Sequence, residues 1–188
     1  MVGIVDVSPV RARTTFGFDR NHQSVSGKAL CVAMSADGQR LYLGGHSGVW
    51  RSDDGGQTWT HPERPQPPQG TTSVPGALLP PAVYDLLISP ANPDIVLAAT
   101  GRDARVPAQN GIWRSTDGAR SWNRVHQFAA SGGRFGTIGS ITVAPGNPEL
   151  MFAGGQFAVG ISTDGGQTWT ERTPQGPAGG AVFYVVGS

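Results

Sequence analysis

The chain has few charged side chains, a single cysteine and no long apolar run. Charged residues make up 14% of its 188 residues, and 14 basic and 13 acidic side chains leave a formal net charge of +1. This balance gives no electrostatic reason to expect binding to nucleic acid or to an anionic membrane. Cys31 cannot form a disulfide within the chain, and its neighbours in ALCVAM indicate a small buried hydrophobe.

Targeting and metal-binding patterns are also missing from the sequence. The stretch MVGIVDVSPVRARTTF has no basic start followed by a sustained apolar segment. Nowhere do about 18 apolar residues run together, so we expect neither a signal peptide nor a transmembrane segment, and the sequence leaves the compartment undecided. The four histidines lack the spacing of a zinc site, and we expect no metal and no cofactor.

Glycine and proline, in contrast, are abundant. The chain holds 28 Gly and 15 Pro, and no stretch keeps apolar residues at helical spacing. Short strands separated by many turns fit this composition best, so the sequence predicts an all-β fold.

Three units share one plan along the chain. ALCVAMSADGQRLYLGG, VYDLLISPANPDIVLAAT and GSITVAPGNPELMFAGG each read as an apolar run, a turn and a second apolar run. SGVWRS, NGIWRS and AVGIS supply a third strand, DG a hairpin turn, and QTWT, RSWNRV and QTWTER a fourth strand. We therefore predict four-stranded meanders at approximately 29–60, 83–125 and 139–172, within one partial domain spanning 1–188.

Such meanders must stack on neighbours, because one alone cannot bury both of its faces. The usual solution at this unit length is radial stacking into a β-propeller of antiparallel blades. Ala181 to Val186 resemble the first strand of a further blade that does not continue. Three blades cannot close a ring that usually needs at least about four. We expect an incomplete or open ring, completed by missing blades of a longer parent chain or by further copies in a homo-oligomer.

A short segment repeats inside each unit, as RSDDGGQTW, RSTDGARSW and ISTDGGQTW. Its last residues, Trp59, Trp122 and Trp169, lie about 63 and about 47 residues apart, close to the roughly 40 to 50 residues of propeller repeats. Turn chemistry accounts for each position, because Ser and Asp accept backbone hydrogen bonds, Gly takes positive φ and Trp buries apolar area. The residues assigned this structural role are Ser52, Asp54, Gly56, Trp59, Ser115, Asp117, Trp122, Ser162, Asp164, Gly166 and Trp169.

The pattern Ser/Thr-x-Asp-x-Gly-x-Thr/Ser-Trp resembles the Asp-box, or BNR repeat; the middle copy has Ala119 in place of the glycine. Similar families include sialidases, xyloglucan-active glycoside hydrolases, sortilin-type receptor domains and photosystem assembly propellers. The resemblance implies a β-propeller and no single activity. A calcium site needs about six to eight oxygen ligands, more than one box offers.

A glycoside hydrolase would need two carboxyl groups about 5 to 9.5 Å apart. Turns and boxes account for most acidic residues, which leaves Asp85, in the strand VYDLL, and Asp103, in the insert GRDAR, as catalytic candidates. Asp85 also reads as an ordinary hydrogen-bonded strand residue, and Asp103 as a solvated loop residue. Xyloglucan-active members carry an acid just after a second strand, where this chain has His46 and Gln156, and only Asp103 approximates it.

The remaining expectation is a binding or scaffolding module for a protein or glycan. The Pro-rich loop 60–82 and the insert 101–110 are long enough to form a recognition surface. Arg102, Arg105 and Arg134 lie in loops where they can meet an anion. Arg51 and Arg114 precede a box at the same position, which indicates a repeated structural contact. The alternative is a fragment of a xyloglucanase-like or sialidase-like hydrolase.

Overall fold

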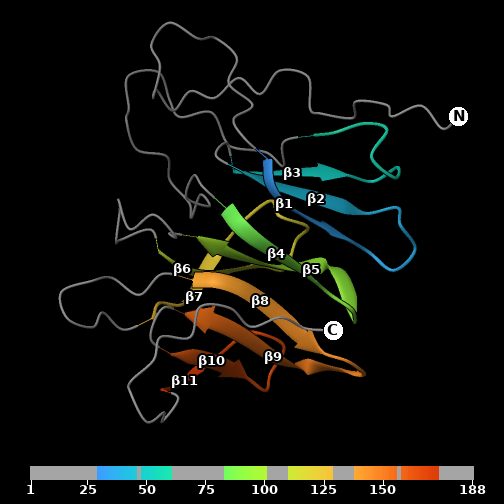
Figure 1. Ribbon diagram of the computed structural model, residues 1–188. Coiled ribbons are helices and arrows are strands. Elements are labelled where there is room, and N and C mark those ends of the chain that lie inside the picture. Colours follow the sequence, from blue (N-terminus) through green and yellow to red (C-terminus); the bar gives the residue numbers. More distant parts are fainter. Residues whose placement is uncertain are drawn as a thin grey trace, which may run out of the picture.

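The computed structural model describes residues 29–45, 48–60, 83–100, 110–128, 138–155 and 158–173. These ranges fold into strands and turns, and they contain no helix long and apolar enough to cross a membrane. The strands form three antiparallel sheets that follow one another along the chain, and Figure 1 shows the sheets stacked in an open row. The predicted all-β class is confirmed.

The first sheet contains β1 (Ala29–Met34), β2 (Leu41–Gly45) and β3 (Gly48–Ser52), in that order. The middle sheet contains β4 (Val83–Ser89), β5 (Asn92–Thr100), β6 (Gly111–Ser115) and β7 (Asn123–His126), also in sequence order. The last sheet contains β8 (Ile138–Ala144), β9 (Asn147–Gly155), β10 (Val159–Ser162) and β11 (Thr170–Arg172). Each sheet is a meander, as the repeated plan predicts.

Two details of the predicted meanders are wrong. The first sheet has three strands, and only the isolated bridge between Arg51 and Thr60 stands where a fourth strand was predicted. The residues from 61 to 82 fall outside the described part of the chain. The dipeptide DG is not a two-residue hairpin turn either, because residues 116–122 and 163–169 separate the paired strands and the fourth strand begins after the tryptophan.

The core lies between the sheets, in two clusters. Alternate residues of β5 point to opposite faces, so that Val96 and Ala98 join the cluster against the first sheet. Leu97 and Ala99 join the cluster against the last sheet. The continuous apolar run IVLAA is thus explained by a middle sheet that is buried on both faces.

Candidate functional site

The three repeated segments that resemble the Asp-box, which we call the boxes, adopt the same hydrogen-bonded turn. In the last box, the Ser162 hydroxyl donates to Asp164 Oδ1 at 2.7 Å and accepts the N–H of Gly166 at 2.9 Å. The N–H of Thr168 donates to Asp164 Oδ1 at 2.9 Å. The first box repeats these contacts with Ser52, Asp54, Gly56 and Thr58, and the middle box with Ser115, Asp117, Ala119 and Ser121.

These donors hold the box carboxylates in the charged state. Hydrogen bonds from the side chain and backbone of Thr58 lower the pKa of Asp54 to about 2. Burial works against the charge of Asp164, but the donors of Thr168 and Ser162 outweigh it and lower that pKa to about 2 as well. No group of three or more His, Cys, Asp or Glu side chains within the described ranges is arranged to hold a metal ion.

Two of the three tryptophans donate a hydrogen bond to their own box turn, and the third is buried between sheets. Trp59 Nε1 donates to the carbonyl of Gly56 at 3.0 Å, and Trp169 Nε1 to the carbonyl of Gly166 at 3.2 Å. Trp122 is buried in the cluster between the first and middle sheets. Ala119 has φ of 70°, the conformation that Gly56 and Gly166 adopt at the same place. The middle box therefore keeps the backbone shape without the glycine.

The boxes lie at one edge of the stacked sheets. The N–H of Gly55 donates to the carbonyl of Gln39, and the N–H of Gly165 to that of Glu149, both at 3.0 Å, which ties each box to the turn between the first two strands of its sheet. We call this side the box edge. In Figure 1 these turns lie on the right.

The opposite edge receives the two long connections of the middle sheet. Val83 pairs with Thr100, and Thr100 pairs with Gly111, so these three strand ends lie side by side. The insert 101–110 leaves from Thr100, and the Pro-rich loop 60–82 arrives at Val83. We call this side the loop edge. Antiparallel pairing thus places both ends of the insert and the end of the Pro-rich loop opposite the boxes, whereas the Pro-rich loop begins beside the first box, at Thr60, which bridges Arg51.

Asp85 lies on β4 close to the loop edge and bridges two sheets. Its Oδ1 accepts the N–H of Leu86 at 2.9 Å, and its Oδ2 accepts the N–H of Ile141 on β8 at 2.7 Å. Burial raises the pKa of Asp85, and the two N–H donors only partly offset this. Within the described ranges, the groups that shift this pKa include no second carboxylate.

Arginines make a repeated contact between sheets. Arg51 donates to the carbonyl of Gly118 in the middle box, and Arg114 to the carbonyl of Gly165 in the last box, both at 3.2 Å. This confirms the structural contact predicted from their shared position before the box. The equivalent residue of the last sheet is Ile161.

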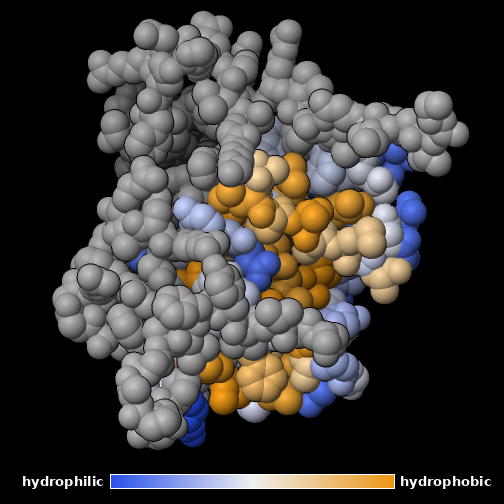
Figure 2. Space-filling view, viewed as in Figure 1, coloured by the Kyte–Doolittle hydropathy of each residue, from blue (hydrophilic) through white to orange (hydrophobic). Residues whose placement is uncertain are grey.

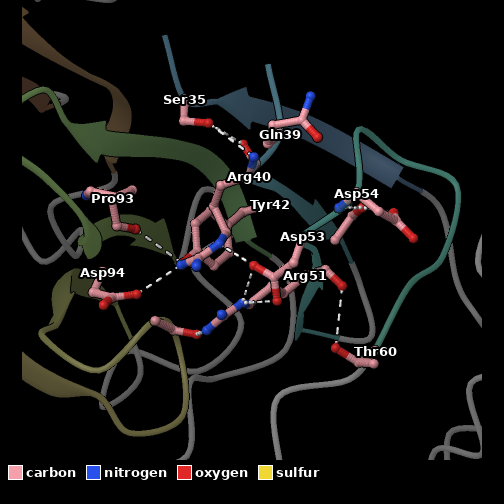
Figure 3. A network of polar contacts seen from close by, with 12 residues as sticks. Ser35, Gln39, Arg40, Tyr42, Arg51, Asp53, Asp54, Thr60, Pro93 and Asp94 are labelled. Atoms are coloured by element: carbon pink, nitrogen blue, oxygen red, sulfur yellow. Dashed lines mark hydrogen bonds and ion pairs between the residues drawn. The ribbon is translucent and has the colours of Figure 1, made fainter. Parts of the chain in front are cut away.

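An ion-pair network that the sequence did not predict joins the first two sheets, as Figure 3 shows. Arg40 donates to Asp94 Oδ1 at 2.7 Å and also pairs with Asp53. The Tyr42 hydroxyl donates to the carbonyl of Pro93 at 3.1 Å. A signal was present, because the residues that replace Arg40 in the other two units are Ile95 and Leu150. A charge at a position that is apolar elsewhere in a repeat indicates a specific partner.

A second missed contact joins the outer strands β7 and β11. His126 Nε2 lies 3.2 Å from Glu171 Oε1, and the imidazole ring packs against Phe128 and Trp169. Burial lowers the pKa of His126 more than the attraction of Glu171 raises it. The two residues come from different units, so no local pattern in the sequence predicted the pair.

Several predicted site residues fall outside the described residues. These are Asp103, Arg102, Arg105, Arg134, His46 and Gln156. The strand predicted at 181–186 and most of the two loops fall outside as well. Of the two catalytic candidates the structure therefore describes Asp85 alone.

No family profile and no curated protein sequence matches the chain. Among solved structures, an ancestral GH74 enzyme matches with a TM-score of 0.54 and 20% identity over 78% of this chain and 18% of that chain. A GH74 enzyme of Niastella koreensis matches with a TM-score of 0.52 and 23% identity over 78% of this chain and 22% of that chain. The GH74 xyloglucanase from Xanthomonas campestris matches with a TM-score of 0.50 and 17% identity over 88% of this chain and 23% of that chain. This chain spans about a fifth of the length of these structures.

The fold is an open β-propeller. The three sheets are its blades, with β1, β4 and β8 as the first strand of each. Identities this low indicate that this chain shares the fold of the matched enzymes, and they do not indicate that it shares their activity.

Proposed function

We propose that the chain is an Asp-box propeller segment that serves as a binding or scaffolding module for a protein or glycan. The three box turns, with their shared hydrogen bonds, support the Asp-box assignment and a structural role for all three boxes. Their carboxylates are already occupied by backbone and hydroxyl donors, so recognition belongs elsewhere on the molecule.

The loop edge is the surface that this proposal assigns to the ligand. The observation that carries it is the pairing of Val83, Thr100 and Gly111, because both long connections of the middle blade start or end there. Propellers vary their loops without disturbing the blade cores, and binding residues gather on such loops. The arginines of these connections would suit an anionic group on the ligand.

The test starts from defined probes. A glycan array carrying xyloglucan oligosaccharides and sialylated glycans, together with a phage-displayed random peptide library, would identify a binder. The binder is then titrated against the unmodified chain and against a chain in which residues 102–109 are replaced by a Gly-Ser segment of equal length. Thr163→Ala, an exposed change at the box edge, is the matched control.

Loss of binding in the loop variant at an unchanged melting temperature, with the control intact, supports the loop edge. Binding that survives replacement of residues 102–109, and then of residues 61–82 as well, would exclude it. A binder lost equally in Thr163→Ala would move recognition to the boxes.

The alternative function is a fragment of a glycoside hydrolase, xyloglucanase-like or sialidase-like. Half-buried Asp85 favours it, since a raised carboxyl pKa suits a general acid and this carboxyl lies near the loop edge. Its hydrogen bonds to two backbone N–H groups, however, are those of a structural link between blades. The second acid would have to come from loops or blades beyond those described.

Hydrolysis separates the two proposals. The chain is incubated with xyloglucan and with an aryl sialoside, and new reducing ends or free aglycone are measured. Turnover that Asp85→Asn or Asp103→Asn abolishes, in a protein that still folds, would establish the hydrolase. Binding without turnover supports the binding module.

A further inference from the structure

The first blade leaves an apolar face open. Val32 and Met34 on β1 are 60% and 63% exposed, and Leu41 and Leu43 on β2 are half-buried. Val32 pairs with Leu43 and Met34 with Leu41, so the four side chains share one side of the sheet. We call them the leading face. Figure 2 shows apolar side chains open to solvent in the region of β1 and β4.

The same positions are buried or partly buried in the two other blades. In the middle blade they are Leu86, Ile88, Val96 and Ala98, which pack against the first blade and are at most 9% exposed. In the last blade they are Ile141, Val143, Met151 and Ala153, which pack against the middle blade. The leading face therefore has the composition of an internal interface, and the described residues place no blade in front of it.

The last blade presents the matching surface at the other end of the row. Thr142, Phe152, Val159 and Ile161 share the side that faces away from the middle blade, and we call them the trailing face. Their equivalents in the middle blade include Leu97 and Ile112, which are fully buried against the last blade. Phe152 and Ile161 keep part of their surface in water.

Neither open face carries the charged residue that its counterpart uses in the contact between the first two blades. The internal contact of the first two blades uses Arg40 and Asp94. At the position of Arg40 the last blade has Leu150, and at the position of Asp94 the first blade has Gln39. At this position, therefore, neither open face has a charged side chain that would need a partner on the other face. Bringing them together would bury no unpaired charge at this point, which is the condition that a stable interface must meet.

We propose that the leading face binds the trailing face of a second copy of this chain. Two copies that meet in this way at both ends form a closed ring of six blades, within the usual range of about four to eight. Three copies would need nine blades. The inference rests on the propeller fold and is independent of the ligand of the loop edge.

The test measures the mass of the full chain by light scattering after size exclusion. We expect twice the 19.6 kDa of one chain. Val32→Asp on the leading face and Phe152→Asp on the trailing face should each shift the mass to that of one chain. The matched control is Asn123→Asp, an exposed position on the outer strand of the middle blade, which should leave the mass unchanged. Thr142→Asp replaces Phe152→Asp if the latter fails to fold.

Mixing the two face variants identifies the geometry. In a mixed pair, the intact trailing face of the Val32→Asp chain meets the intact leading face of the Phe152→Asp chain, so a two-chain species should return.

A gain of affinity provides a second readout. Ile161→Arg restores the arginine that contacts the next box in both internal interfaces, and it should slow dissociation of the pair severalfold.

Three results would overturn the proposal. The first is a single-chain mass at all concentrations, as expected if further blades of a longer parent chain cover the faces. The second is a Phe152→Asp chain that stays paired, which indicates two leading faces in contact. The third is a mixture that remains single-chain.

Discussion

At the scale of single residues, the box aspartates act as acceptors that tie a turn to its own backbone. Asp164 accepts from the side chain of Ser162 and from the N–H groups of Gln167 and Thr168. Removing the carboxylate leaves these donors without their partner. We expect Asp164→Ala to lower the free energy of unfolding by about 1 to 3 kcal/mol. Urea denaturation followed by tryptophan fluorescence measures the change.

Ligand binding provides the control for this substitution. The box edge lies opposite the loop edge, so the affinity of any ligand found for the loops should be the same in Asp164→Ala and in the unmodified chain. Lost binding in a variant that melts like the unmodified chain would mean that the box itself contacts the ligand.

Acid should destabilise the chain through the same carboxylates. The folded pKa of Asp54 and of Asp164 is about 2, below the ordinary 3.8, so their stabilisation is present above about pH 5 and is lost as pH falls toward 2. Asp85 has the opposite sign, because its raised folded pKa makes the folded state bind a proton more readily. Urea midpoints between pH 6 and pH 2.5 should fall for the unmodified chain.

Two variants separate these contributions to the acid profile. Asp164→Asn should show a shallower fall than the unmodified chain, because one stabilising charge is absent at all pH values. Asp85→Asn should show a steeper fall between pH 6 and pH 4, since the group that gains from protonation is missing. Identical profiles for all three proteins would contradict the assignment of these carboxylates.

At the scale of strands and turns, repetition made the sequence informative. Repeated apolar runs separated by turn residues predicted the paired runs that became β1 with β2, β4 with β5 and β8 with β9. Contacts between blades were harder to predict. Arg40 with Asp94 and His126 with Glu171 join different units, and only the stacking of sheets brings these side chains together.

The packing of one blade's box on the preceding blade can be tested with a glycine. Gly166 has φ of 80°, and a Cβ added there would lie 2.5 Å from Leu97 Cδ2 of the middle blade. Gly166→Ala therefore combines backbone strain of about 1 kcal/mol with overpacking of about 1 to 3 kcal/mol. Chemical denaturation gives the loss directly, and Leu97→Ala in the same chain should relieve the overpacking part through a favourable coupling energy.

At the scale of the whole molecule, the row of blades formed by the described residues has two open ends, and its stability should depend on whether they are covered. A pair of chains binds only in the folded state, so the melting temperature should rise with chain concentration. Val32→Asp should remove this dependence, because it places a charge on the leading face. Calorimetry from micromolar to millimolar chain concentration measures both. A melting temperature independent of concentration in the unmodified chain would contradict the pair.

Gly56 reports on the same interface from within the first box. Its φ is 89°, yet a Cβ there would meet nothing nearer than Trp59 Cζ2 at 3.8 Å. In one chain alone, Gly56→Ala should therefore cost only the strain of about 1 kcal/mol. In the pair, Phe152 of the second copy would stand where Leu97 stands against Gly166, and the added methyl group would clash with it. We expect Gly56→Ala to be mild in the Val32→Asp background and to weaken pairing severalfold without it, as measured by sedimentation equilibrium.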